Sequence, residues 1–235
     1  MSVALKEAPS LSPHESRSLA RARVTVFANT KGGVGKTTDA VNVAAMLARG
    51  IYAIEGDRIT PLAPPQRVLF IDTEQHNTGS SWLGVKVTDP EQSSAMLFER
   101  PYDDPNEVLR LIQPAKREPF DIIPSHYTAL DRVDRDPLLS DYTFAHNIEH
   151  LRQYYDHIIV DTPGNNVHRL VAGPLIAADG LVMPIKPDAK VFDSMEQFVE
   201  LIYRIKKGPN PRLHIDGWLI SNAGSKGDTD AAALH

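Results

Sequence analysis

Short apolar runs alternate with longer amphipathic segments along the 235-residue chain, and this pattern predicts a layered α/β fold. Runs such as Val68-Leu69-Phe70-Ile71 and Ile158-Ile159-Val160 are typical of strands buried on both faces. Because the two kinds of segment alternate, we expect a doubly wound, mostly parallel sheet flanked by helices. The predicted strands cover residues 23–29, 67–72, 121–124, 157–161, 181–185 and 214–221. The predicted helices cover residues 36–49, 107–115, 143–154, 167–177 and 194–206.

Two segments depart from this alternation. Residues 1–22 are rich in Ser, Pro and Arg, and we expect a flexible tail in front of one domain that spans residues 23–235. Within that domain, residues 50–66 contain three prolines, which exclude a regular helix, and Gly56-Asp57, which is typical of a turn. We therefore expect a surface insertion between the first helix and the second predicted strand.

The composition narrows the class of protein. There is no cysteine, which excludes disulfides and thiolate metal sites and agrees with a cytoplasmic location. The net charge of −5 does not favour nucleic-acid binding over the whole surface, so any DNA contact would need a local patch. No apolar run approaches the roughly 18 residues that span a bilayer, and the first residues lack the apolar stretch of a signal peptide. We expect no membrane partner.

A glycine-rich loop between the first strand and the first helix predicts the chemistry. Its residues are Lys31-Gly32-Gly33-Val34-Gly35-Lys36-Thr37-Thr38. A strand, such a loop and a helix N-terminus together present backbone N–H groups to a phosphate. Lys36 is placed to reach the β- and γ-phosphates, and the Thr37 hydroxyl to bind Mg²⁺. Lys31 stands out, because a phosphate-binding loop does not need a lysine five residues before Lys36.

Acidic side chains follow two of the buried strands. Asp72 ends one strand, Glu74 follows two residues later, and Asp161 ends another. In this architecture ligands bind at the carboxyl ends of the strands, where a carboxylate beside Thr37 can hold Mg²⁺ directly or through water. Glu74 could orient the water that attacks the γ-phosphate. Gly164, in the segment after Asp161, permits a loop that is ordered by the triphosphate and released after hydrolysis.

These motifs together resemble the ParA/MinD family of ATPases with a deviant Walker A motif, and most closely the ParA-type partition ATPases. The resemblance runs from about residue 24 to residue 222 and is strongest at Lys31 with Lys36. It implies an ATP-dependent homodimer in which Lys31 reaches the partner's phosphates. It further implies ATP and Mg²⁺ as cofactors, with Asp72 and Asp161 in the Mg²⁺ shell. The remaining implied nucleotide contacts are Gly32, Gly33, Val34, Gly35, Lys36, Thr37, Thr38 and Asn222, the last at the adenine edge.

Two departures from the family pattern are visible. The family's catalytic Asp is replaced by Glu74, which is one methylene longer, and the proline that usually follows is missing. We expect Glu74 to act as a displaced catalytic carboxylate or hydrolysis to be unusually slow. Family members also continue for one or two helices beyond the last predicted strand, whereas this chain ends at His235, so we expect C-terminal helices to be missing.

Two further clusters carry weaker signals. His146 and His150 fall on one helical face in an H-x-x-E-H pattern, but no third ligand is evident, so an exposed helix face is the better interpretation than zinc. A basic cluster surrounds a Gly-Pro turn and is either a helix C-terminus or a DNA-binding patch, which we weigh evenly. Its members are Arg204, Lys206, Lys207 and Arg212.

The leading hypothesis is a ParA-like ATPase for plasmid or chromosome partition, located in the cytoplasm on the nucleoid. Its ATP-bound dimer would bind DNA without sequence preference, and a ParB-like protein would stimulate hydrolysis and release it. Three alternatives stay open. The first is a MinD-like positioning ATPase acting at a membrane or cell pole. The second is a metabolic ligase or kinase on the same fold, and the third is a nucleotide-gated scaffold with negligible hydrolysis.

Overall fold

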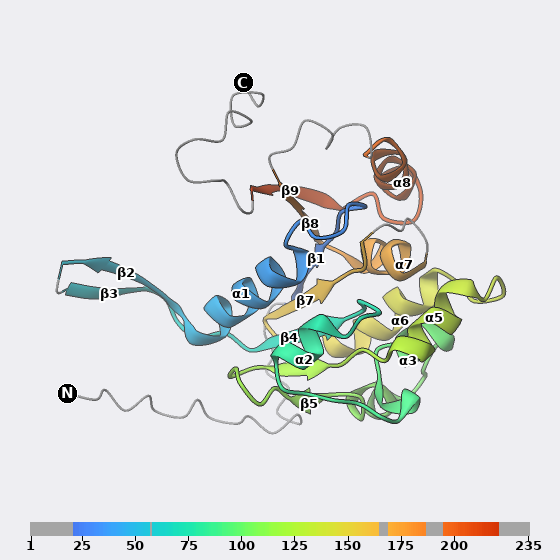
Figure 1. Cartoon of the computed structure of the whole chain (residues 1–235), viewed down its shortest axis with the longest axis horizontal. Coiled ribbons are helices and arrows are strands. Elements are labelled where there is room, and N and C mark those ends of the chain that lie inside the picture. The colour runs from blue at the N-terminus through green and yellow to red at the C-terminus, as the bar shows by residue number, and fades with distance from the viewer. Residues whose placement is uncertain (1–20, 57, 165–168, 187–194, 221–235) are drawn as a thin grey trace.

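The computed structural model describes residues 21–56, 58–164, 169–186 and 195–220. Its centre is a seven-stranded sheet in the order β5-β6-β4-β7-β1-β8-β9, in which only β5 is antiparallel to its neighbour (Figure 1). The strands are β1 (Arg23–Phe27), β4 (Val68–Asp72), β5 (Gln113–Pro114), β6 (Asp121–Ile123), β7 (His157–Asp161), β8 (Gly180–Ile185) and β9 (His214–Ile220). The predicted doubly wound, mostly parallel fold is confirmed.

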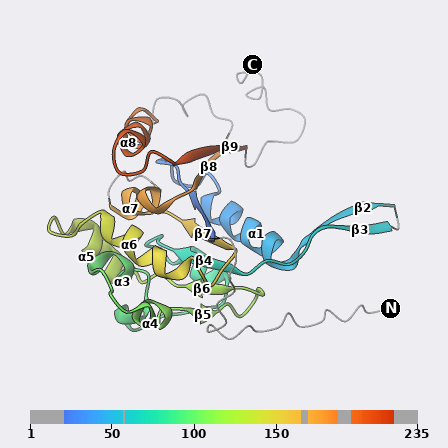
Figure 2. The same cartoon turned by 180° about the vertical axis from the view of Figure 1, so that it is seen from behind.

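Helices cover both faces of this sheet (Figure 1 and Figure 2). One face carries α1 (Lys36–Arg49) and α2 (Thr78–Trp82). The other carries α3 (Met96–Glu99), α4 (Pro105–Leu109), α5 (Tyr127–Arg135), α6 (Tyr142–Leu151), α7 (Arg169–Ala177) and α8 (Glu196–Lys207). A 3-10 turn, Pro90–Gln92, lies in the connection after α2.

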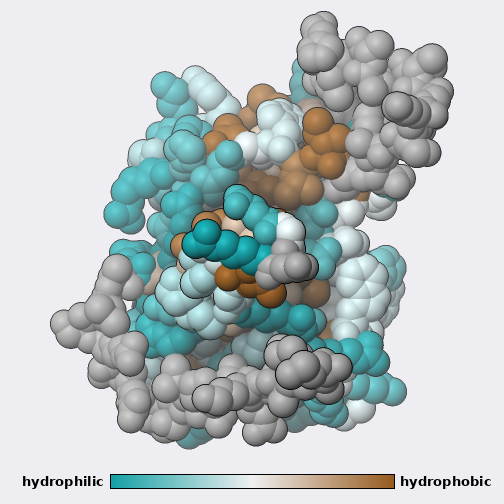
Figure 3. All heavy atoms as spheres, turned by 90° about the vertical axis from the view of Figure 1, so that its left-hand side faces the viewer, coloured by the Kyte–Doolittle hydropathy of each residue, from teal (hydrophilic) through white to brown (hydrophobic). Residues whose placement is uncertain are grey.

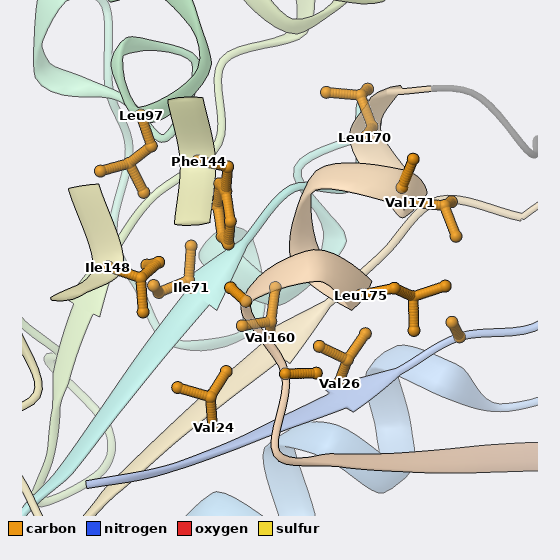
Figure 4. Close-up of a cluster of buried hydrophobic side chains, with 14 of the residues drawn as sticks. Val24, Val26, Ile71, Leu97, Phe144, Ile148, Val160, Leu170, Val171 and Leu175 are labelled. Carbon is orange, nitrogen blue, oxygen red and sulfur yellow. The ribbon is translucent and has the colours of Figure 1, made fainter. Parts of the chain in front are cut away.

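Each face of the sheet has its own apolar core. Alternate residues of one strand point to opposite sides, so Val24 and Val26 of β1 pack with α6 and α7, while Phe27 packs with α1. Figure 4 shows the larger core, in which side chains from the central strands meet Phe144, Ile148 and Leu175 of the helices. These cores fix the strands, and therefore also the loops at their carboxyl ends.

The predicted elements between residues 78 and 135 needed correction. A helix was expected over residues 107–115, but the helix covers only Pro105–Leu109, and the chain then turns into the edge strand Gln113–Pro114. The helices α2, α3 and α5 were not predicted at all. They are short, and the Gly, Ser and Pro residues around α2 and α3 obscure the 3.6-residue periodicity on which helix prediction depends.

The segment predicted as a surface insertion is a β-hairpin. It consists of β2 (Ile51–Glu55) and β3 (Arg58–Ala63), which pair antiparallel only with each other. Gly56 has a φ of 59° in the predicted turn. The hairpin projects from the end of α1 away from the rest of the molecule in both cartoon views (Figure 1 and Figure 2). We call residues 51–63 the arm.

In the described part of the chain, no helix is both long enough and apolar enough to cross a bilayer.

Candidate nucleotide-binding site

The predicted phosphate-binding loop lies at the carboxyl ends of the central strands. It leaves β1 at Ala28 and enters α1 at Lys36, with Gly33 and Gly35 in left-handed conformations of φ 70° and 99°. A side chain other than glycine would be strained at both positions, because its Cβ disfavours positive φ. The loop therefore has the backbone that its glycine pattern predicts.

Asn29 anchors the start of this loop, a role that the sequence did not reveal. Its amide nitrogen donates to the Pro184 carbonyl at 2.7 Å, and its amide oxygen accepts from the Lys31 backbone N–H at 3.0 Å. Asn29 is 3% exposed, so these contacts are shielded from water. One side chain thus fixes the loop relative to the end of β8.

Lys36 is buried at the first position of α1. Its ammonium donates to the Lys31 carbonyl at 3.2 Å. Burial lowers the pKa of Lys36, and the negative charges of Asp161 and Glu74 partly oppose this. An anion that binds beside this helix N-terminus would stabilise the charged form of the desolvated lysine, and the lysine charge would in turn stabilise the bound anion.

Asp161 ends β7 with its carboxylate next to the Thr37 hydroxyl, and a contact of this hydroxyl with the carboxylate lowers its pKa. It is fully buried, and neither of its oxygens has a hydrogen-bond partner of good geometry among the described residues. Burial, followed by the nearby Asp72, raises the pKa of Asp161 well above the usual range, and Thr37 and Lys36 only partly oppose this. An unsatisfied buried carboxylate beside a hydroxyl fits a divalent cation, which prefers such oxygen ligands.

Asp72 lies in a different environment, although it also ends a central strand. Its carboxylate accepts from the Glu74 backbone N–H at 3.0 Å and from the Ser80 N–H and hydroxyl, each at 2.7 Å. The Ser125 hydroxyl lies 3.0 Å away and completes the contacts. Burial raises the pKa of Asp72 to about 6, against the lowering effect of these hydrogen bonds. Ser80 and Ser125 were not predicted as site residues.

Glu74 lies near the phosphate-binding loop, but its carboxylate is engaged at the start of α2. One oxygen accepts from the His76 backbone N–H at 2.9 Å, and the Thr78 hydroxyl is 3.3 Å from the same oxygen. Its charge acts on the pKa of Lys36, Asp72 and Asp161, so all four groups belong to one electrostatic cluster.

The loop after β7 closes against the phosphate-binding loop at Gly164. A Cβ on Gly164 would lie 2.9 Å from both the Gly32 Cα and the Lys36 ammonium nitrogen. Only glycine allows this approach, because real Cβ atoms essentially never come that close. Thr162, which donates its hydroxyl to the Phe27 carbonyl at 2.8 Å, fixes the start of the same loop to β1.

An open cleft of about 390 Å³ runs along the outer side of the phosphate-binding loop. It is lined by Gly33, Val34, Gly35, Thr38, Asp39, Lys186, Leu219 and Ile220. Four of the predicted nucleotide contacts, Gly33, Val34, Gly35 and Thr38, therefore share one surface with the ends of β8 and β9. Asn222, predicted at the adenine edge, lies outside the described residues.

The two histidines of the H-x-x-E-H pattern do not form a metal site. The Nε2 atoms of His146 and His150 lie 3.0 Å and 2.8 Å from the Tyr102 carbonyl oxygen, so both rings point at one backbone acceptor. Within the described ranges, no group of three His, Cys, Asp or Glu side chains is placed to hold a metal ion. The pair fastens the segment before α4 to α6.

Comparison with known proteins identifies the family to which this chain belongs. Residues 22–215 match the family described as AAA domain, with ParA/MinD-type members. This chain belongs to that family, as a ParA-like member. The resemblance predicted from Lys31, Lys36 and the strand-end carboxylates is thereby confirmed.

Individual relatives agree with this assignment. The chain is 28% identical over 201 residues to the sporulation initiation inhibitor protein Soj of Bacillus subtilis, covering 85% of this chain and 72% of that protein. It is 29% identical over 204 residues to the chromosome partitioning protein ParA of Myxococcus xanthus, covering 85% of this chain and 64% of that protein.

A solved structure of cobyrinic acid a,c-diamide synthase from Mycobacterium smegmatis with bound ADP and magnesium shares the fold. Its TM-score is 0.71, its sequence identity is 20%, and the match covers 91% of this chain and 80% of that one. At this identity the likeness concerns the fold alone.

Proposed function

We propose that this ParA-like chain is a partition ATPase that binds and hydrolyses ATP with Mg²⁺ as a timed switch. The observation that carries this is Asp161, a buried and unsatisfied carboxylate beside Thr37 and the phosphate-binding lysine. The named relatives are partition proteins, and the related solved structure holds ADP and magnesium. In this proposal, nucleotide hydrolysis at the site serves to change the assembly state of the protein.

The residues of the phosphate-binding loop and Asp161 would hold the Mg²⁺ ion and the phosphates. Thr37 and Asp161 would hold Mg²⁺, which neutralises phosphate charge when bound. Lys36 would contact the terminal phosphates, with N–H groups of Gly32, Gly33, Val34 and Gly35 around them. Thr38 would contact a phosphate from the first turn of α1.

The acidic segment after β4 would supply the remaining catalytic groups. Asp72 has most of its hydrogen-bonding capacity used by Ser80 and Glu74, so we assign it to the outer Mg²⁺ shell, through water. Glu74 would orient the attacking water, and for this its carboxylate would have to leave the His76 N–H.

The switch requires a homodimer in the ATP state, with Lys31 reaching the phosphates of the second subunit. A second positive charge at a buried phosphate interface offsets the repulsion between the subunits and couples dimerisation to ATP. A ParB-like protein would then stimulate hydrolysis and dissolve the dimer.

Non-specific DNA is the proposed partner of the ATP dimer on the nucleoid. Within the basic cluster, Lys206 donates to the Leu213 carbonyl, and the Lys207 ammonium lies 5.6 Å from the centre of the Tyr203 ring. Lys206 is therefore used in the fold, which leaves Arg204, Lys207 and Arg212 as the better candidates for phosphate contacts.

Binding to random-sequence duplex DNA, measured with ATP and with ADP across a salt series, tests the partition function. We expect binding with ATP only, and an affinity that falls linearly with salt on logarithmic axes, because each phosphate contact releases counterions. The same weak binding with both nucleotides would contradict the proposal.

A second function is favoured by one observation. The Glu74 carboxylate is held by the His76 N–H. If this contact persists with ATP bound, no carboxylate orients the attacking water, hydrolysis is negligible, and the chain is a nucleotide-gated scaffold. Single-turnover hydrolysis by the wild type and by Glu74→Ala separates the two functions. A large loss in the variant supports the ATPase, and equal rates near zero support the scaffold.

A further inference from the structure

The arm exposes an apolar face that nothing in the described part of the chain covers. Tyr52, Ile54 and Ile59 are 49%, 73% and 66% exposed. The register pairs Ile54 with Ile59 and Tyr52 with Pro61, so these four side chains share one face of the hairpin. An isolated two-stranded hairpin is only marginally stable in water, and such a face is stabilised when another surface covers it.

The base of the arm is tightly packed against the end of α1. Gly50 has a φ of 87°, and a Cβ there would lie 2.9 Å from the Ala63 carbonyl oxygen and 3.2 Å from Pro65. The Gln66 backbone N–H donates to the Leu47 carbonyl at 2.9 Å, which ties the returning strand to α1. In Figure 3 the arm points at the viewer, away from the rest of the molecule.

The charges on the arm decide what kind of surface can cover it. The described charged residues are Glu55 and Arg58, which pair across the strands next to the turn. Such an arm lacks the run of Lys and Arg that attracts DNA or an anionic bilayer. A charged tip also opposes insertion into lipid. The fitting surface is therefore another protein.

The two edges of the hairpin differ in their capacity to pair. β3 contains Pro61 and is followed by Pro64 and Pro65, which lack the N–H groups that a new strand would need. β2 contains no proline, and its outer edge pairs with no other described strand. A strand can therefore add to β2 but not readily to β3.

We propose that a second copy of this chain covers the arm, by antiparallel pairing of β2 with β2 about a two-fold axis at Ala53. This register sets Tyr52 opposite Ile54 of the second copy, and Ile54 opposite its Tyr52. Both are pairs of an aromatic with a β-branched side chain on the apolar face. A shift by one residue would turn the two apolar faces to opposite sides of the new sheet.

The same register avoids charge repulsion. It places Glu55 opposite the uncharged Ile51 of the second copy, at the base of that arm, where Arg49 is 58% exposed and pairs with Glu118 at 2.8 Å. No like charges face each other between the β2 strands. The result is a four-stranded sheet with one continuous apolar face, formed without nucleotide and independently of Lys31.

The absence of cysteine from the chain allows a direct test by cross-linking. In the full-length Ala53→Cys variant, the two introduced thiols would face each other across the two-fold axis, within reach of a disulfide. We expect a covalent dimer under mild oxidation without nucleotide. Thr60→Cys is the matched control, because Thr60 pairs with Ala53 on the neighbouring strand and lies one strand away from the axis. It should form no covalent dimer.

Sedimentation of the uncross-linked protein without nucleotide gives the second measurement. We expect a reversible monomer–dimer equilibrium, and a dissociation constant at least about tenfold higher for Ile54→Lys, since one charge on a small apolar interface costs that much. Ile54→Lys should still hydrolyse ATP. A wild type that stays monomeric at all concentrations, or Thr60→Cys cross-linking as well as Ala53→Cys, would overturn the proposal. Either result would leave the partition function untouched.

Discussion

At the residue scale, Asp72 and Asp161 show how two carboxylates at equivalent strand ends acquire different properties. Asp72 is held by Ser80 and Ser125, whereas the oxygens of Asp161 lack such partners. Both are fully buried, so the difference lies in hydrogen bonding rather than in exposure. The buried negative charge of Asp161 is therefore unfavourable in the protein without a cation, and a cation bound at this position would offset it.

The Asp161→Asn variant tests this directly. We expect the nucleotide-free protein to become more stable by about 1 kcal/mol, because a buried charge without hydrogen bonds is removed. The raised pKa means that the folded wild type holds its proton at pH values where the unfolded chain has lost it. Wild-type stability therefore falls as pH rises from about 4 through the folded pKa, and the difference between the two proteins grows over that range.

Urea unfolding at pH 5 and pH 8 without nucleotide or Mg²⁺ measures this effect. Asp72→Asn is the control with the opposite sign, since an amide cannot accept all of the hydrogen bonds from Ser80 and Glu74. A destabilised Asp161→Asn protein at pH 8 would contradict the interpretation of Asp161 as an unsatisfied charge.

The sequence predicted both carboxylates as Mg²⁺ ligands and could not separate them. Ser80 lies 8 residues from Asp72 in the sequence, and Ser125 lies 53 residues from Asp72 and 45 from Ser80. Their roles therefore depend on the folded arrangement. The phosphate-binding loop was predictable because its glycines, lysines and threonine act locally, at fixed spacing. The roles assigned to Lys31, Glu74 and Asn222 stay predictions.

At the scale of elements, buried strands were predicted well and short helices poorly. Central strands such as Val68–Asp72 are apolar at nearly every position, a local signal that tertiary contacts reinforce. The segment between α2 and α6 instead depends on side chains that replace backbone hydrogen bonds. Asn147 of α6 is the chief example, since it donates to the Leu97 and Arg100 carbonyls and accepts from the Tyr102 N–H.

We expect Asn147→Ala to lower the free energy of unfolding by about 2–3 kcal/mol, because three buried backbone groups lose their partner. Chemical denaturation followed by circular dichroism measures the loss. Asn106→Ala is the matched control: Asn106 is exposed and its amide contacts only Asp104, so its effect should stay within about 0.5 kcal/mol. Equal effects of the two substitutions would show that Asn147 does not hold this segment.

At the scale of the whole molecule, the nucleotide site and the arm are separate surfaces. The phosphate-binding loop precedes α1 and the arm follows it, so the helix lies between them (Figure 1). ATP-dependent dimerisation through Lys31 and self-association through β2 can thus be lost one at a time.

Light scattering with ATP and with ADP tests the first of these interfaces. We expect Lys31→Ala to lose the ATP-dependent increase in mass while it retains nucleotide binding, since Lys36 and the loop backbone remain. Lys86→Ala, which removes an exposed lysine outside the site, should behave as the wild type. A Lys31→Ala protein that still dimerises with ATP would remove the cross-subunit role of Lys31.

The 14 residues of α1 make it a rod about 21 Å long, and the arm adds about 17 Å beyond it. Because the base at Gly50 is tightly packed, the helix and the arm together extend as one long element from Lys36, which lies at the phosphate-binding loop. A rotation of about 5° around Lys36 would displace the tip by about 3 Å across the direction of the strands, more than half of the ~4.8 Å spacing between paired strands. Angular changes too small to alter the core would therefore appear at the tip as a sideways displacement of ångström size.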